Sequence, residues 1–157
     1  MRVKHIMTKN PTCCVPSDVA SKAASIMRDE DTGVIPVIDN EQGQKVAGVV
    51  TDRDLCMNVV AEGRDPRLVA VEACMTGVVV TCSPNDSVER AAELMRENQI
   101  RRLLVVDEQR TLQGIVSIAD LVGRGDIKGA EAHETLKTVS APNRAPSKPR
   151  AKSRSAA

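Results

Sequence analysis

The chain contains the same residue pattern twice, and this internal repeat limits its possible folds more than any other feature. Residues 3–39 align with residues 71–107 at an offset of 68, and residues 48–55 align with residues 114–121 at an offset of 66. The order of the matched residues is kept throughout, and a single two-residue gap joins the two alignments. Chance is a poor explanation for such a match. We therefore interpret most of the chain as two copies of one structural unit.

The spacing of apolar residues predicts the same elements in both halves. Helical spacing predicts amphipathic helices over residues 19–27 and 88–95, and Asp86 with Glu89 resembles a capping box at the start of the second helix. Short apolar runs predict strands over residues 34–38, 46–51, 103–106 and 112–117. Extended segments over residues 12–15 and 78–82 precede the helices, and further helices over residues 52–61 and 118–122 follow the strands. Each half is thus expected to be a β-α-β-β-α unit of mixed α/β (α+β) class.

The chain divides into three parts. Residues 1–63 are expected to form the first repeat, residues 64–125 the second, and residues 126–157 a short helix over 130–139 with a basic tail. Gly63 and Pro66 mark the link between the repeats. A unit of about 60 residues buries too little apolar surface to be comfortably stable alone. We therefore expect the two repeats to pack on each other through their sheets.

Charge is distributed unevenly along the chain, although its net charge is only +1. Residues 141–157 carry five basic and no acidic residues, which leaves 17 basic and 21 acidic residues for the rest. This tail is also rich in Pro, Ser and Ala, a composition typical of segments that do not fold by themselves. Two uses remain open: the tail solubilises the protein, or it binds nucleic acid or an acidic partner weakly and in a salt-dependent manner.

The composition argues against several classes of protein. Because the chain has no Phe, Tyr or Trp, it lacks the aromatic platform on which single-stranded nucleic acids stack. No apolar run approaches the roughly 20 residues of a membrane helix, and no apolar segment follows the basic N-terminus as in a signal peptide. We therefore expect a cytoplasmic protein without membrane contact.

The five cysteines and two histidines give little indication of a metal site or of disulfides. The cysteine count is odd, no Cys-x-x-Cys spacing occurs, and His5 and His133 are solitary. We interpret the cysteines mainly as small buried apolar residues and expect no bound metal. A redox role for the adjacent Cys13 and Cys14 remains open.

Polar residues that could carry chemistry gather where the last strand of each half meets the following helix. Thr51 precedes Asp54 by three residues in the first half, and Ser117 precedes Asp120 by three in the second. One interpretation is structural, because a hydroxyl and a carboxylate at this spacing cap a helix start. The other is a binding site: free N–H groups at a helix start favour a phosphate, and a carboxylate can accept hydrogen bonds from both hydroxyls of a ribose. Recurrence of the pattern in both halves favours the binding site.

At this point the repeat resembles a known family, the CBS domain, and the tandem arrangement resembles a CBS pair, or Bateman module, of stand-alone bacterial proteins. The resemblance rests on Ile6-Met7-Thr8, on the Ile-Pro-Val-Ile-Asp segment over residues 35–39, and on residues 48–55, together with their partners in the second half. It covers residues 3–125. It implies two β-α-β-β-α repeats packed sheet to sheet about a pseudo-twofold axis.

The resemblance also implies two clefts between the repeats that bind an adenine nucleotide or a related adenosyl ligand. The candidate ligands are AMP, ADP, ATP, S-adenosylmethionine and NAD. By analogy, Asp54 and Asp120 hold the ribose diol, and Thr51 and Ser117 contact the ribose or the phosphate. Val49 and Ile115 match the apolar residues beside the adenine. The basic residues that would bind the phosphates are Arg53, Arg101 and Arg102. The family also implies a homodimer.

Two functions from different classes therefore remain. The first is a regulatory module that senses an adenosyl ligand and signals to a separate effector protein. The alternative is a dimerisation scaffold whose basic tail associates with nucleic acid or an acidic partner. An enzyme is not expected, because no nucleophile and base occur together, and no cofactor is expected to be required.

Overall fold

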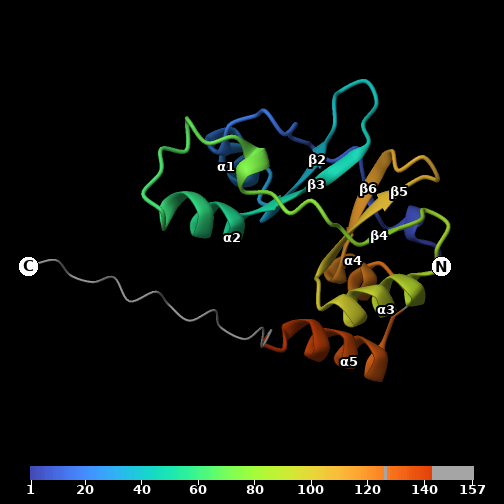
Figure 1. Ribbon diagram of the computed structural model, residues 1–157. Helices are drawn as coiled ribbons and strands as arrows, with labels where there is room; N and C mark the ends of the chain where they lie inside the picture. The colour runs from blue at the N-terminus through green and yellow to red at the C-terminus, as the bar shows by residue number, and fades with distance from the viewer. Residues whose placement is uncertain (126, 143–157) are drawn as a thin grey trace, which may run out of the picture.

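A computed structural model describes residues 1–125 and 127–142 of the chain (Figure 1). The single-turn 3₁₀ helices are η1 (Val3–His5) and η3 (Val71–Ala73), and η2 (Cys56–Val60) is a π-helix. The strands are β1 (Thr8–Lys9), β2 (Val34–Ile38), β3 (Val46–Thr51), β4 (Thr81–Cys82), β5 (Arg102–Val106) and β6 (Leu112–Ser117). The α-helices are α1 (Ala20–Asp29), α2 (Asp52–Leu55), α3 (Val88–Asn98), α4 (Ile118–Gly123) and α5 (Gly129–Ser140). The predicted mixed α/β class is confirmed.

The central hairpins of the two repeats have the same register. Val34 pairs with Thr51 at the open end of β2–β3, and Arg102 pairs with Ser117 at the equivalent place in β5–β6. The register of each hairpin also shifts just before its last pair. The shift lies between Val37 and Ile38 in the first hairpin and between Val105 and Val106 in the second. The two hairpin turns meet, since the Leu112 N–H donates to the Gln44 carbonyl at 2.9 Å. The repeat in the sequence is therefore also a repeat in space.

Each repeat sends its first segment to the other repeat. Strand β1 pairs antiparallel with β6 of the second repeat, and Thr76 of the second repeat pairs antiparallel with Val49 of the first. The Val3 N–H donates to the Asp86 carbonyl, whereas the Val71 N–H donates to the Asp18 carbonyl. The proposed division of the chain at residue 63 describes the sequence units, but each folded half takes its first segment from the other unit.

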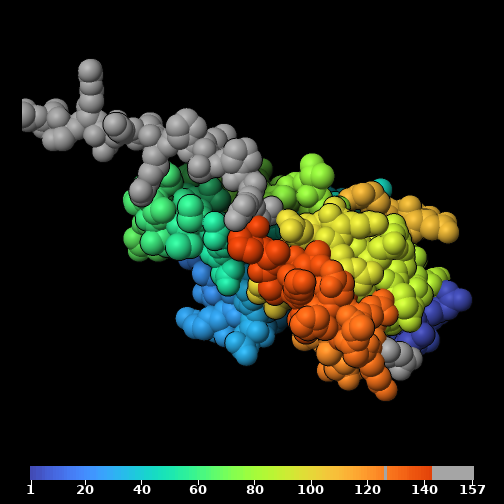
Figure 2. All heavy atoms as spheres, turned by 90° about the horizontal axis from the view of Figure 1, so that it is seen from below, coloured from blue at the N-terminus to red at the C-terminus, as the bar shows by residue number. Residues whose placement is uncertain are grey.

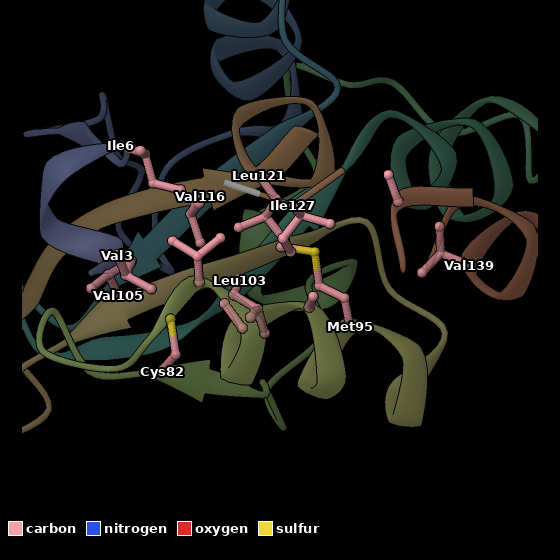
Figure 3. Packing of buried hydrophobic residues seen from close by; sticks show 14 residues of the cluster. Val3, Ile6, Cys82, Met95, Leu103, Val105, Val116, Leu121, Ile127 and Val139 are labelled. Atoms are coloured by element: carbon pink, nitrogen blue, oxygen red, sulfur yellow. The ribbon is translucent and has the colours of Figure 1, made fainter. Parts of the chain in front are cut away.

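The helices cover the outer faces of the two sheets. In Figure 1, α1 and α2 lie on one side of the strands and α3, α4 and α5 on the other. Two separate apolar cores follow from this arrangement, and both consist of aliphatic residues, methionine and cysteine. Figure 3 shows that Val3 and Ile6 of the N-terminal segment reach the core of the second repeat, where Leu103, Val105 and Val116 pack.

The start of α3 differs from its prediction. Ser87, not Asp86, is the N-cap, because the Ser87 hydroxyl accepts the Arg90 N–H at 3.1 Å. The Asp86 carboxylate instead accepts the Ser83 N–H at 2.8 Å and closes the preceding turn. The expected extended segments are also shorter than predicted: β4 has two residues, and Cys14 makes a single parallel bridge to Val37.

The expected helix near the C-terminus is present as α5. It lies across α3, as the orange-to-red segment on the yellow surface of Figure 2 shows. The buried Thr135 hydroxyl accepts a hydrogen bond from Arg96 at 2.7 Å and donates to the Glu131 carbonyl at 2.8 Å. Most of the predicted basic tail, residues 143–157, lies outside the described residues. No helix in the described part of the chain combines the length and the apolar composition of a membrane span.

Candidate functional site

The two strand–helix corners have nearly identical geometry. The Thr51 hydroxyl accepts the Asp54 N–H at 3.1 Å, and the Asp54 Oδ2 accepts the Thr51 N–H at 2.9 Å. The same two bonds join Ser117 and Asp120 at 3.2 and 2.9 Å. Both corners are therefore capping boxes, which confirms the structural interpretation of this motif.

These caps leave few N–H groups at the start of α2 for an anion. The Asp52 N–H donates to the Gly33 carbonyl, the Arg53 N–H to the Asp52 carboxylate, and the Asp54 N–H to the Thr51 hydroxyl. The expectation of free N–H groups at this corner is therefore wrong. Any phosphate near it must be held by side chains.

A cleft of about 710 Å³, here called cleft A, lies between the repeats beside the first corner. Val49 and Thr51 of β3 line it from the first repeat. The second repeat contributes Arg101, just before β5, and Leu104 in the middle of β5. Val139 of α5 also contributes to its wall. Cleft A therefore brings together residues that are far apart in the sequence.

A smaller cleft of about 290 Å³, here called cleft B, lies beside the second corner. Ser117 and Asp120 line it from the second repeat, and Thr8 from the exchanged N-terminal segment. Glu30 and Thr32, which follow α1, line it from the first repeat. The Thr12 hydroxyl donates a hydrogen bond to Glu30 at this wall.

The two clefts are related by the internal repeat. Thr51 and Val49 in cleft A correspond at the sequence offset to Ser117 and Ile115 in cleft B, and Thr76 corresponds to Thr8. Val34, Arg102 and Ile115 line both clefts, so the two cavities adjoin at these residues. The two cavities differ in volume and in lining, and Val139 of α5 lines cleft A alone.

The charges of the two clefts differ. Cleft A is lined by three arginines, Arg53, Arg101 and Arg102, and by one carboxylate, Asp52. Cleft B is lined by two carboxylates, Glu30 and Asp120, and by Arg102 alone among basic residues. All three arginines are exposed, and their guanidinium groups form no ion pair with residues 1–125 or 127–142.

The structure places the predicted site residues unevenly. Cleft A contains Val49, Thr51, Arg53, Arg101, Arg102 and Ile115, and cleft B contains Arg102, Ile115, Ser117 and Asp120. Asp54 does not line cleft A, and the carboxylate that does line it is Asp52.

Sequence reasoning missed Asp52, Glu30 and the crossing threonines Thr8 and Thr76. The two threonines occupy matched repeat positions, which is a signal that could have identified them. Glu30 gives no such signal, because its counterpart is Asn98.

The thiols do not resemble a redox site. Burial raises the pKa of both Cys13 and Cys14 from 9.0 to about 11, with the adjacent thiol or Asp18 adding to the shift. Burial also raises the pKa of Cys82 to about 12. Since the thiolate is the reactive form, these three side chains are poor nucleophiles near neutral pH. All five cysteines are free, and Cys14, Cys74 and Cys82 are buried as expected, whereas Cys13 is half-buried and Cys56 is exposed, so the expectation of burial is wrong for Cys56.

Metal ligands are not gathered in the described part of the chain. No group of three or more His, Cys, Asp or Glu side chains there is placed to hold an ion.

Comparison with known proteins gives a consistent result. The CBS domain family matches residues 3–61 and again residues 71–125. The CBS domain-containing protein YhcV of Bacillus subtilis is 41% identical over 119 residues, which cover 76% of this chain and 81% of that protein. Hypoxic response protein 1 of Mycobacterium tuberculosis is 30% identical over 118 residues, which cover 75% of this chain and 80% of that protein.

Solved structures agree with this assignment. The crystal structure of Hypoxic Response Protein I, described with two coordinated zinc ions, has a TM-score of 0.68 at 29% identity and matches 77% of this chain and 96% of that one. CBSX2 in complex with AMP has a TM-score of 0.66 at 27% identity and matches 76% of this chain and 92% of that one. The chain therefore belongs to the CBS domain family, of which it contains a tandem pair.

Proposed function

We propose that the protein is a regulatory module that binds an adenine nucleotide or a related adenosyl ligand in clefts A and B and signals to a separate effector protein. The observation that carries this proposal is the pair of clefts related by the repeat, each with a hydroxyl at a strand–helix corner and an apolar β residue beside it. A single such cleft is weak support, but two equivalent ones formed by exchanged segments are stronger.

The chemistry of the walls suits this class of ligand. Val49 and Ile115 are partly exposed apolar residues next to the corners and offer a surface for a purine. The Asp120 carboxylate accepts hydrogen bonds from the Ser117 N–H and hydroxyl at Oδ2, which leaves Oδ1 for a ribose hydroxyl. CBSX2, which shares this fold, has been crystallised with AMP. The candidate ligands are AMP, ADP, ATP, S-adenosylmethionine and NAD.

Thermal unfolding of the full chain in the presence of each candidate ligand tests the proposal. A ligand at 100 times its dissociation constant adds about 2.7 kcal/mol to the free energy of unfolding, which raises the midpoint by several degrees. The shift should be clearly smaller with the matching 2′-deoxyribose analogue, because the carboxylate then loses one of its two hydroxyl donors. No shift with any of the five ligands at millimolar concentration would contradict the proposal.

The same preparation tests the alternative function. A scaffold that acts through its basic tail would show no ligand shift but would bind DNA or RNA in a salt-dependent manner. That binding should disappear when residues 141–157 are deleted, because those residues carry the five basic charges. A homodimer is part of both proposals, and sedimentation equilibrium of the full chain measures it directly.

A further inference from the structure

The wall of cleft A is suited to a ligand that carries several negative charges. Arg53 reaches it from the α2 corner, and Arg101 and Arg102 reach it from the entry to β5. Because none of the three pairs with a carboxylate in the described chain, each guanidinium can donate to phosphate oxygens. The Thr51 hydroxyl accepts the Asp54 N–H, and its own proton has no acceptor among the described residues.

The wall of cleft B has the opposite character. Glu30 and Asp120 face the same cavity of about 290 Å³ from opposite repeats. Neither carboxylate forms an ion pair with the residues that the structure describes. The Ser117 hydroxyl donates to Asp120 Oδ2 at 2.6 Å, so this corner offers its hydroxyl proton less readily than Thr51 does. A phosphate in cleft B would meet two negative charges in a narrow space.

Arg102 is the basic residue common to both clefts. One guanidinium can direct its paired N–H groups at one anion at a time. A phosphorylated ligand in cleft A, next to Arg53 and Arg101, would hold Arg102 on that side. Cleft B would then keep only its two carboxylates.

We propose that the two clefts select ligands by charge: cleft A takes an adenosyl ligand with a phosphorylated 5′ group, and cleft B takes one whose 5′ group is uncharged or positively charged. This inference rests on the proposed function, since it requires that both clefts bind an adenosyl group. It adds the chemical class of ligand for each cleft.

Three adenosine compounds that differ only at the 5′ position test this selectivity. AMP carries a phosphate, adenosine is neutral, and 5′-amino-5′-deoxyadenosine carries an ammonium group at pH 7. Titration calorimetry of the full chain with each compound measures the number of sites and the affinities. Arg101→Gln changes only cleft A, and Glu30→Gln changes only cleft B, so these variants assign each site to a cleft.

The expected result is a crossed pattern. Arg101→Gln should weaken the binding of AMP roughly ten-fold and leave the affinity for the amino compound unchanged. Glu30→Gln should weaken the binding of the amino compound roughly ten-fold and leave the affinity of the tight AMP site unchanged. Adenosine should respond to neither variant. Both side chains are exposed, and unfolding curves of the variants establish that they remain folded.

Two negative outcomes are distinguishable. If each variant changes the affinities for AMP and for the amino compound by the same factor, or if both compounds bind equally well in both clefts, the proposed charge selection is wrong while the proposed function stands. If none of the three adenosine compounds binds the wild-type chain, and the five candidate ligands also give no shift, the proposed function fails and this inference fails with it.

Discussion

The carbonyl group of Thr8 on β1 packs against the Cα atom of Gly114 on β6, on the side where a side chain would stand. A Cβ atom at position 114 would be 2.7 Å from the Thr8 carbonyl oxygen, and 2.9 Å from the Met7 sulfur. Gly48 stands in the same relationship to the Thr76 carbonyl in the other repeat. Each exchanged segment therefore crosses its partner strand at a glycine, because any side chain there would push the crossing backbone away.

The first prediction concerns this crossing. Gly114→Ala should lower the free energy of unfolding by about 1–3 kcal/mol, because the new methyl group overpacks against backbone that cannot move freely. Denaturant unfolding measures the change. Gly123→Ala is the control, since a Cβ atom there meets nothing within 4 Å, and its effect should stay within about 1 kcal/mol. Equal effects of the two variants would contradict the role assigned to the crossing.

The second prediction concerns the exchanged N-terminal segment. Ile6 is 2% exposed and belongs to the core of the second repeat, although in the sequence it lies at the start of the first repeat. Ile6→Ala should therefore lower the free energy of unfolding by about 2–5 kcal/mol. Leu68→Ala, at a residue that is 83% exposed, should change it by less than about 0.5 kcal/mol. A small effect at Ile6 would mean that the segment is not part of this core in solution.

The third prediction concerns the ribose contact proposed for cleft B. Asp120→Asn removes the charge but keeps an oxygen that can accept the Ser117 N–H, so the helix start should be preserved. Adenosine affinity at cleft B should fall about ten-fold or more, whereas 2′-deoxyadenosine, already a weaker ligand, should change little. Calorimetry measures both affinities. Glu62→Gln, exposed and outside both clefts, serves as the control and should leave adenosine binding intact.

The fourth prediction concerns the thiols. At pH 8 an alkylating reagent should modify the exposed Cys56 first, and Cys13 and Cys14 slowly, because their pKa values of about 11 keep them protonated. In Cys56→Ser the remaining alkylation rate should rise steeply between pH 9 and pH 11. Peptide mass spectrometry identifies the modified residues, and rapid modification of Cys13 at pH 8 would contradict the prediction.

The same shifts determine a pH dependence of stability. A thiol whose pKa is raised by folding stays protonated in the folded state while the unfolded chain already loses its proton near pH 9. The folded state is therefore most favoured below pH 9, and stability falls as the pH rises through about 11 for Cys13 and Cys14. Urea unfolding at pH 8 and pH 10.5 should show the decrease.

The sequence alone was sufficient for much of this structure. The apolar periodicity of residues 88–95 and the strand runs of the second half predicted α3, β5 and β6, because local patterns of burial decide such elements. Recurrence of the Thr51–Asp54 pattern at Ser117–Asp120 indicated where the clefts lie. The helical pattern of residues 130–139 likewise predicted α5.

Other features depended on contacts between residues distant in the chain, which no local pattern encodes. The exchange of first segments pairs Thr8 with Ile115, over a hundred residues away, and only packing of the two cores decides that pairing. The same holds for the charges of the clefts: Glu30 and Asp120 face the same cavity because the two repeats pack against each other. The sequence thus determined the repeated unit and its corners, whereas the tertiary structure decided which side chains of one repeat complete the cleft of the other.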